Sequence, residues 1–130
     1  MDNKIEKLDK VTVKFAGDSG DGVQVLGDQF GNATAVVGND FATLPDYPAE
    51  IRAPQGTTYG VSSYQIQFAA YDIYTPGDTP DVLVAFNPAA LKVNLTSLKP
   101  GGLLIVNEDE FTEQNLRRAG LPQTPWKMIL

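Results

Sequence analysis

The pattern of hydrophobic and polar positions predicts alternating strands and helices. Residues 11–16 (VTVKFA) alternate apolar with polar side chains and then run into glycines, which is typical of a strand. Residues 81–86 (DVLVAF) and 103–106 (LLIV) are almost continuously apolar and predict two buried strands. Residues 40–44 and 61–70 predict two more strands. Strands of this kind alternate with helices in α/β proteins, so we expect a three-layer, Rossmann-like α/β domain with a mostly parallel sheet.

The first predicted helix follows the glycines that end the first strand. Its buried face is predicted by apolar residues at steps of three and four: Val23, Leu26, Phe30, Ala33 and Val37. Asp21 is expected to cap the helix, with Gln24 completing a capping box, and Gly38 is expected to end it. Gly27, Gly31 and Ala35 fall four residues apart along this helix, and each of the two glycines costs about 1 kcal/mol relative to Ala. We therefore expect another backbone to approach closely along the strip that they form.

Two further helices are predicted in the second half of the chain. Pro88 follows the strand over residues 81–86 and suits the first turn of a helix over residues 89–98. A shorter helix is expected over residues 112–118, with Gly120 just past its end.

The length and net charge of the chain indicate how many domains it has and which partners it is not expected to bind. The chain has 130 residues, with 10 Lys and Arg against 16 Asp and Glu, a net charge of −6. We expect a polar leader over residues 1–10 and one domain over residues 11–130. The apolar run at residues 126–130 indicates a fragment of a longer subunit. The acidic balance argues against nucleic acid or a membrane as partner, and with neither a signal peptide nor a membrane span we expect a cytoplasmic protein.

Cysteine and histidine are both absent from the sequence. Their absence excludes disulfides, thiolate ligation of an iron–sulfur cluster, ordinary zinc sites and Ser-His or Cys-His nucleophile pairs within this chain. A metal would need oxygen ligands. We predict neither a catalytic residue nor a metal site here.

The glycine-rich turn after the first strand is the strongest candidate binding site: Gly17, Asp18, Ser19, Gly20, Asp21 and Gly22. Its glycines permit positive φ and expose backbone amides, and the following helix directs its positive end at the turn, as in phosphate sites. The spacing differs from the dinucleotide fingerprint, and the Lys-Ser/Thr pair of a P-loop is missing. A tight turn without a ligand explains the same residues. A calcium loop is a weaker rival, because Asp18 and Asp21 are three residues apart.

A second candidate is the proline-rich segment over residues 45–56. Its prolines exclude a regular helix or an inner strand, so we expect a long fixed loop, and such loops are usually functional. Within it Glu50 and Arg52 can pair with each other or grip a ligand, beside Thr57. A solvated ion pair on the loop is the alternative, and composition alone favours that interpretation.

Four segments in order resemble the gamma domain of 2-oxoacid:ferredoxin oxidoreductases: residues 17–24 (GDSGDGVQ), 38–45 (GNDFATLP), 48–57 (PAEIRAPQGT) and 99–102 (KPGG). The similarity is nearest to the N-terminal part of the alpha subunit of the 2-oxoglutarate type, where this domain precedes a thiamine-enzyme domain. Pyruvate-type relatives usually carry a G-x-G-G-Q-G loop, which this chain lacks. That difference favours the 2-oxoglutarate branch, with enzymes of broad 2-oxoacid specificity as the alternative.

The resemblance implies a function that the residues alone do not reveal. Enzymes of this family decarboxylate a 2-oxoacid on thiamine diphosphate, pass electrons through [4Fe–4S] clusters to ferredoxin and release an acyl-coenzyme A. It implies that this chain, inactive alone, supports the reaction through coenzyme A binding or interdomain packing. Thiamine diphosphate and the clusters would be held elsewhere, and the implied partners are the thiamine-binding domains and, for the complete enzyme, ferredoxin.

The site residues carried over by the resemblance, as candidates for ligand or interdomain contact, are Gly17, Asp18, Ser19, Gly20, Asp21, Gly22, Glu50, Arg52 and Thr57. The alternative from another class is a stand-alone Rossmann-type nucleotide-binding domain. The glycine spacing argues against it, and so does the second strand, because Asp46 is the only acidic candidate at its end and lies past a proline.

Overall fold

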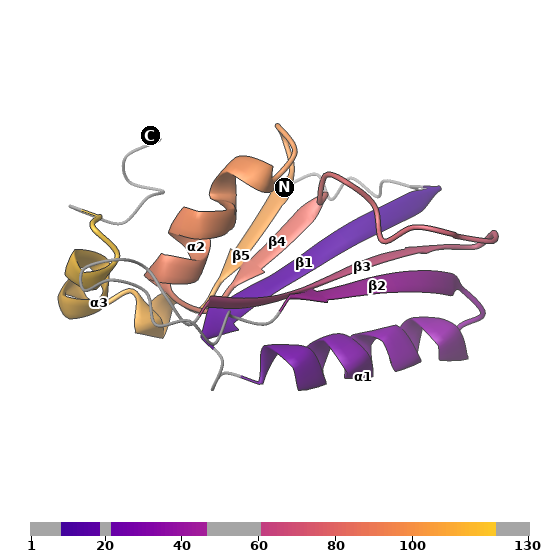
Figure 1. Ribbon diagram of the computed structural model, residues 1–130, viewed down its shortest axis with the longest axis horizontal. Coiled ribbons are helices and arrows are strands. Elements are labelled where there is room, and N and C mark those ends of the chain that lie inside the picture. Colours follow the sequence, from indigo (N-terminus) through magenta and orange to yellow (C-terminus); the bar gives the residue numbers. More distant parts are fainter. Residues whose placement is uncertain (1–8, 19–21, 47–60, 122–130) are drawn as a thin grey trace, which may run out of the picture.

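The computed structural model describes residues 9–18, 22–46 and 61–121, and their elements follow the predicted order (Figure 1). The strands and helices are β1 (Lys10–Asp18), α1 (Val23–Val36), β2 (Asp40–Asp46), β3 (Val61–Ala69), β4 (Val82–Ala85), α2 (Pro88–Asn94), β5 (Leu103–Val106) and α3 (Glu113–Arg118). Short 3-10 turns cover Leu95–Ser97 and Glu108–Glu110. The expected element at residues 126–130 and most of the proline-rich segment lie outside the described residues.

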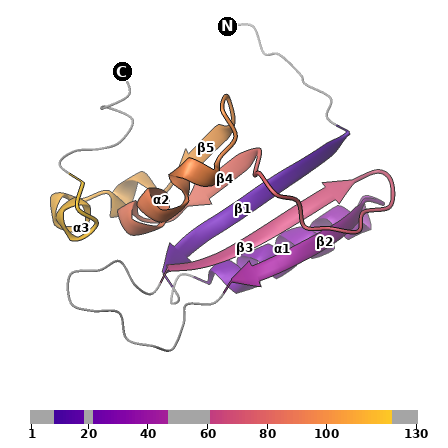
Figure 2. The same cartoon turned by 45° about the horizontal axis from the view of Figure 1, so that its top comes forward.

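The strands form one sheet in the order β2-β3-β1-β4-β5 (Figure 2). β1, β4 and β5 are parallel neighbours, which confirms the parallel arrangement predicted for these three strands. β3 runs antiparallel to both β1 and β2. The sheet is therefore mixed, with four strands pointing one way and β3 pointing the other.

Helices cover both faces of the sheet, so the predicted three-layer α/β architecture is confirmed (Figure 1). α1 packs over β1, β2 and β3, and its side of the sheet holds the core residues Val13, Phe15, Val23, Tyr64 and Ile66. α2 lies on the opposite face, where its residues Ala90 and Leu91 form a core cluster with the strand residues Ala16, Leu83 and Ala85. The two sets alternate along β1 because successive side chains of a strand point to opposite faces.

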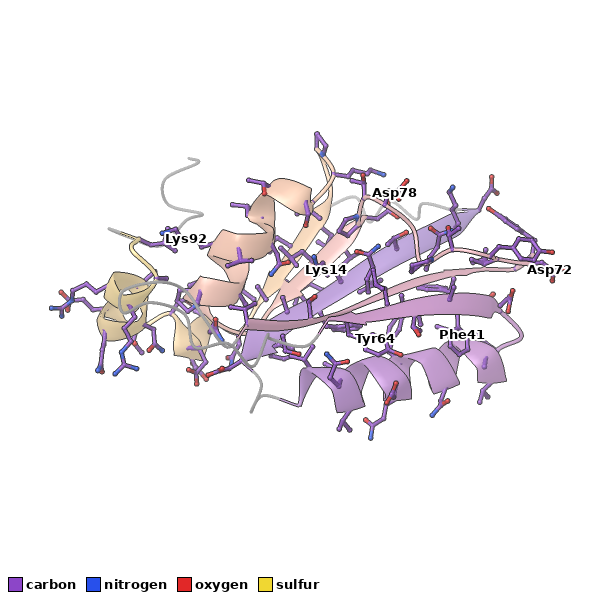
Figure 3. All side chains as sticks on the ribbon, viewed as in Figure 1. Lys14, Phe41, Tyr64, Asp72, Asp78 and Lys92 are labelled. Carbon is purple, nitrogen blue, oxygen red and sulfur yellow. The ribbon has the colours of Figure 1, made fainter. Side chains whose placement is uncertain are left out.

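The buried face of α1 differs from the predicted one. Its buried residues are Val23, Gly27, Gly31 and Thr34, whereas Leu26, Ala33 and Val37 of the predicted face are exposed. A Cβ at Gly27 would fall on the Tyr64 ring, and one at Gly31 would lie 3.2 Å from Phe41 Cε2. Tyr64 and Phe41 lie between the helix and the sheet (Figure 3). Gly27 and Gly31 are close-packed as expected, but against aromatic rings rather than backbone, and Ala35, the third position of the predicted strip, is exposed.

Three of the predicted helix ends are confirmed. Gly38 has a left-handed φ of 91° just past α1, and its amide donates to the Ala35 carbonyl. α2 begins with Pro88, after Asn87, whose Oδ1 accepts a 2.8 Å hydrogen bond from the Ala90 amide. α3 ends before Gly120, which has a φ of 75°. These ends show that the local sequence sets most of the helix boundaries.

The prediction that β5 is a buried strand is wrong for half of its residues. Leu103 is 57% exposed and Ile105 is 47% exposed, while Leu104 and Val106 pack into the α2-side core. β5 is the last described strand on its side of the sheet, and α1 packs mainly on β1, β3 and β2 on the face that Leu103 and Ile105 share. An apolar run therefore did not distinguish a strand covered on both faces from one covered on a single face.

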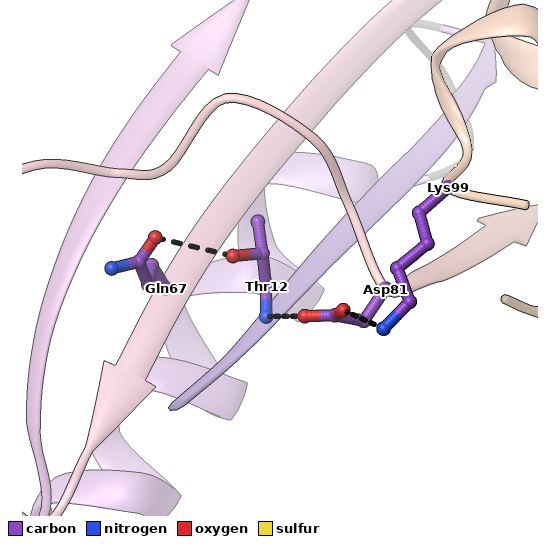
Figure 4. Close-up of polar contacts among 4 residues, drawn as sticks. All are labelled: Thr12, Gln67, Asp81 and Lys99. Atoms are coloured by element: carbon purple, nitrogen blue, oxygen red, sulfur yellow. Dashed lines mark hydrogen bonds and ion pairs between the residues drawn. The ribbon is translucent and has the colours of Figure 1, made fainter. Parts of the chain in front are cut away.

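A polar cluster joins the beginnings of β1 and β4, at the end of the sheet away from the glycine-rich turn (Figure 4). The Thr12 amide donates to Asp81 Oδ2 at 2.9 Å, and Lys99 Nζ lies 2.9 Å from Asp81 Oδ1. Burial raises the pKa of Asp81, but the hydrogen bond from Thr12 and the charge of Lys99 outweigh it and hold the pKa below 3.8. Thr12 also donates to Gln67 at 3.2 Å. The cluster fixes the two strands relative to each other.

Candidate functional site

Several segments that the sequence analysis identified as candidate sites begin or end at one end of the sheet, the end formed by the carboxyl termini of its parallel strands. β1 ends there at Asp18 and β2 ends there at Asp46, while β3 begins there at Val61. β4 ends at the same edge, because it pairs in parallel with β1 and the Phe86 amide donates to the Ala16 carbonyl at 2.9 Å. The carboxyl ends of the parallel strands are thus neighbours, which is where ligands bind on open α/β sheets.

The structure places three of the predicted site residues. Gly17 is buried in β1 opposite Ser62, and Asp18 is exposed at the end of that strand. Gly22 is exposed at the start of α1. The other six lie outside the described residues: Ser19, Gly20, Asp21, Glu50, Arg52 and Thr57.

The strand ends on either side of the proline-rich segment lie at the same end of the sheet. Val61, the first residue of β3, pairs with Asp18 of β1, and Asp46, the last residue of β2, pairs with Ser63 of β3. The residues between them, 47–60, lie outside the described residues.

The start of α1 is built differently from the predicted capping box. The N-cap residue is Gly22, with a left-handed φ of 75°, rather than Asp21, and it has no side chain to accept a hydrogen bond from the first amides. The Gly22 carbonyl accepts from the Leu26 amide at 2.9 Å, so the helix begins directly at this glycine. The first turn of α1 contains no acidic residue. The positive end of the helix dipole consequently faces the site edge.

Gln24 ties α1 to β3 instead of completing a cap. Its Nε2 donates to Ser62 Oγ and to the Ser63 carbonyl, both at 2.8 Å. Because a carbonyl can only accept, these contacts fix the orientation of the amide. Gln24 Oε1 is buried, and no described residue donates to it. A buried acceptor without a partner costs about 1–3 kcal/mol, which marks this position as one that a further donor would stabilise.

The sequence analysis did not predict the contact of Gln24 with β3. Gln24 lies three residues after Asp21, which is the spacing of a capping box, so its side chain was assigned to the helix start. The available signal was the pair of adjacent serines, Ser62 and Ser63, at the beginning of a strand. A small hydroxyl and an exposed carbonyl at that position can receive a side chain from the helix packed above them.

The described residues were also compared with the requirements of a metal site and of a membrane-spanning helix. Within residues 9–18, 22–46 and 61–121, no three His, Cys, Asp or Glu side chains are grouped so that they could hold a metal ion. No helix of the same residues combines the length and apolar character needed to cross a bilayer.

Comparison with known proteins identifies the family. The model of the pyruvate ferredoxin/flavodoxin oxidoreductase family matches residues 12–129, nearly the whole chain. The chain belongs to this family. The relationship inferred from the four sequence segments is thus confirmed.

Curated relatives include subunits of 2-oxoglutarate enzymes. The chain is 60% identical over 120 residues to the 2-oxoglutarate oxidoreductase subunit KorA of Mycobacterium tuberculosis, covering 92% of this chain and 18% of that protein. It is 30% identical over 106 residues to the 2-oxoglutarate synthase subunit KorC of Methanothermobacter thermautotrophicus, covering 80% of this chain and 53% of KorC. The chain thus spans about a fifth of KorA and about half of KorC.

Solved structures share the fold. A 2-oxoglutarate:ferredoxin oxidoreductase from Magnetococcus marinus, with 2-oxoglutarate, coenzyme A and succinyl-CoA bound, matches with a TM-score of 0.67 and 31% identity. The match covers 77% of this chain and 16% of that one. The gamma subunit of a keto/oxoacid ferredoxin oxidoreductase from Geobacter sulfurreducens matches with a TM-score of 0.62 at 23% identity, over 77% of this chain and 51% of that one.

Proposed function

We propose that this chain is the gamma-type domain of a 2-oxoglutarate:ferredoxin oxidoreductase, in which it helps to bind and orient coenzyme A. The observation that carries the proposal is the left-handed start of α1 at Gly22, near the end of the sheet where β1 and β2 end and β3 begins. Family membership and the 60% identity to a 2-oxoglutarate oxidoreductase subunit support the reaction, the oxidative decarboxylation of a 2-oxoacid to an acyl-coenzyme A.

Coenzyme A suits this edge because of its phosphates. Amides at the start of a helix donate to phosphate oxygens, and the helix dipole favours their negative charge. Apart from the chain neighbours of Gly22, no atom of the described residues lies within 4 Å of the place where its Cβ would be, which would let a ligand approach the backbone there. Asp18, exposed at the end of β1, would repel a phosphate unless its carboxylate faced a hydroxyl or an amine.

The remaining cofactors of such an enzyme do not fit the residues of this chain. The sequence has no cysteine, so the thiolates that hold [4Fe–4S] clusters must come from other domains. We place thiamine diphosphate, which would supply the electron sink for decarboxylation, on the thiamine-binding domains that we propose as partners. Ferredoxin is the proposed electron acceptor of the complete enzyme, and the cytoplasm its compartment. The residues of this chain contribute binding and positioning and none is assigned a catalytic step.

A second role at the same edge is an interdomain seam. Gln24 Oε1 is a buried acceptor to which no described residue donates. A neighbouring thiamine-binding domain could supply that donor as well as a ligand could. A stand-alone nucleotide-binding domain is not favoured, because the glycine spacing differs from the dinucleotide fingerprint and the chain matches the oxidoreductase family over residues 12–129.

The test is calorimetric titration of the complete enzyme with coenzyme A, with NAD as a parallel arm. Three variants are compared with the wild type: Gly22→Ala, Gly38→Ala and Asp18→Asn. Gly22 and Gly38 lie at opposite ends of α1, both have left-handed φ, and both have open space where a Cβ would go. The two substitutions therefore strain the same helix similarly, and only Gly22→Ala disturbs the proposed binding end.

We expect Gly22→Ala to weaken coenzyme A binding roughly tenfold, the loss of about one charge-assisted hydrogen bond, and Gly38→Ala to leave it unchanged. Asp18→Asn should keep or tighten affinity if the turn binds phosphate, and weaken it if Asp18 holds a ligand hydroxyl. If both Gly22→Ala and Asp18→Asn bind coenzyme A with unchanged affinity but alter subunit assembly, this end of the sheet is an interdomain contact and does not bind coenzyme A. Binding of NAD instead of coenzyme A would contradict the proposal.

A further inference from the structure

One part of the sheet buries polar side chains instead of apolar ones. Thr12 of β1 pairs with Gln67 of β3, and Gln65 lies two residues before Gln67. All three side chains therefore point to the face that α2 covers at Ala16. Thr12 is 4% exposed, Gln65 7% and Gln67 8%, and Thr12 Oγ1 donates to Gln67 Oε1 at 3.2 Å (Figure 4). We call these three residues the polar floor.

The polar floor is covered by the connection that runs back over the sheet from the end of β3 to the start of β4 (Figure 2). We call residues 71–79 of this connection the strap. Gln65 Nε2 donates to the carbonyls of Pro76 and Gly77, at 3.1 and 2.6 Å. Gly77 has a left-handed φ of 86°, and a Cβ there would fall on Gln67 Oε1. The backbone of the strap therefore lies directly on the polar floor.

The side chains of the strap bury little apolar surface. Tyr71 is 52% exposed and Tyr74 is 88% exposed. The other exposed residues of the strap are Asp72, Thr75, Asp78 and Thr79. By contrast α2, on the same face of the sheet, buries Ala90 and Leu91 completely. Segments with few buried apolar contacts open at a lower free energy than the core of a domain. When the strap opens, bonds to water can replace its hydrogen bonds, because both partners of each bond are polar.

We propose that the strap opens from the polar floor as a unit while the sheet and the helices stay folded, so that the domain has a closed and an open state. The chain stays attached to the sheet near both ends of the strap. The Ile73 amide donates to Asp40 Oδ2 of β2 at 2.7 Å, and the Asp81 amide donates to the Thr12 carbonyl at 2.8 Å. Opening exposes the hydroxyl and amide groups of the polar floor, a hydrogen-bonding surface that the closed state hides. This opening is independent of the proposed coenzyme A role, because the polar floor lies toward the end of β1 opposite to Asp18.

The test measures how fast a thiol under the strap reacts with a maleimide in the complete enzyme. The chain has no natural cysteine, so Thr12→Cys and the control Ala16→Cys each introduce a single thiol into it. Both positions are buried on one face of β1, Thr12 beneath the strap and Ala16 in the core cluster of α2. Mass spectrometry of the peptide that contains each thiol gives its labelling rate, without urea and at urea concentrations below the unfolding transition.

We expect the thiol of Thr12→Cys to react at least about tenfold faster than the thiol of Ala16→Cys. Its rate should change little with urea, because opening of the strap exposes little additional surface. The rate of Ala16→Cys should rise with urea, because a larger part of the domain must unfold to expose it. Equal rates with the same urea dependence would overturn the proposal. If Thr12→Cys does not assemble, Ala69→Cys is measured in its place, since Ala69 is 4% exposed on the same face and pairs with Asp40.

A second pair of variants, each combined with the two thiols, tests the contact between the strap and the polar floor. Gly77→Ala places a Cβ on Gln67 Oε1, whereas Gly101→Ala, at a similar φ of 79°, has open space. Both substitutions strain the backbone, and only Gly77→Ala displaces the strap. Gly77→Ala should raise the labelling rate of Thr12→Cys about tenfold further and leave that of Ala16→Cys unchanged, and Gly101→Ala should change neither. An equal rise at both thiols in Gly77→Ala would show that the strap unfolds together with the core, which also overturns the proposal.

Discussion

The two strand-to-helix junctions at the site edge are built in different ways. β1 and β4 are parallel neighbours, so both junctions follow strand ends at the same end of the sheet, with α1 and α2 on its opposite faces. At α2, Asn87 Oδ1 accepts from the Ala90 amide, and Pro88 has no amide hydrogen that needs a partner. At α1, the N-cap is Gly22, which has no side chain. One junction uses its own side chain to satisfy the first turn, and the other leaves the backbone accessible.

The two helices also pack differently on the sheet. α2 places Ala90 and Leu91, both fully buried, against the small residues Ala16 and Ala85. α1 rests its glycines on the rings of Tyr64 and Phe41. Two glycines in place of Ala weaken a helix by about 2 kcal/mol, and the N-cap residue Gly22 adds no side-chain hydrogen bond at its start. Local choices that oppose stability are expected at functional positions, so the contrast supports the start of α1 as the binding end.

The largest expected effect is on the packing of α1. Gly27→Ala should lower the free energy of unfolding by about 1–3 kcal/mol, because its Cβ would fall on the buried Tyr64 ring. Gly31→Leu should have an effect of similar size, since a Cβ there already lies 3.2 Å from Phe41. Denaturant unfolding of each variant gives the change directly.

Asn32→Leu provides the matched control, because Asn32 is the exposed neighbour of Gly31 in the same helix. Leu is a better helix former than Asn, so this variant should be as stable as the wild type or slightly more stable. A stabilised Gly27→Ala variant would show that the Tyr64 ring moves aside and that the close packing of α1 is not required.

The next effect concerns the capped junction. Asn87→Ala removes the acceptor of the Ala90 amide and should lower the free energy of unfolding by about 1 kcal/mol. Asn87→Asp keeps an acceptor oxygen and should retain most of that stability. Thermal melts of both variants test the comparison. A loss in Asn87→Asp as large as in Asn87→Ala would mean that the cap contributes little and that other contacts of Asn87 dominate.

The sequence predicted the parts of the fold that local chemistry determines. The strands β1 and β4 follow from their apolar patterns, and Gly38, Pro88 and Gly120 fix helix ends because few other residues suit those positions. The buried face of α1 was mispredicted because the contact is made by Gly27 and Gly31, which carry no hydrophobic side chain. The exposed half of β5 was mispredicted because an apolar run does not state how many faces of a strand are covered.

The sequence predicted which segments meet at the candidate site, but it did not predict which side chains contact one another there. Strand direction alone brings Asp18, Asp46 and Val61 to one edge. The contact of Gln24 with Ser62 and Ser63 joins residues nearly forty positions apart, and no local spacing encodes it. The spacing between Asp21 and Gln24 instead predicted a capping box with Asp21 as N-cap, whereas the N-cap of α1 is Gly22.

The smallest expected effect concerns Asp81, which fixes the beginnings of the two strands that lead into these junctions. Its pKa is lower in the folded state than its ordinary value of 3.8, so the charged carboxylate stabilises the fold above that value. As the pH falls below 3.8 and through the folded pKa, this contribution is lost. Asp81→Asn should therefore be less stable than the wild type at pH 7, and the difference should shrink at pH 3. Urea midpoints at both values measure it, with the exposed Asp78→Asn as control. A difference that stays constant with pH would show that the Asp81 charge does not join β1 to β4.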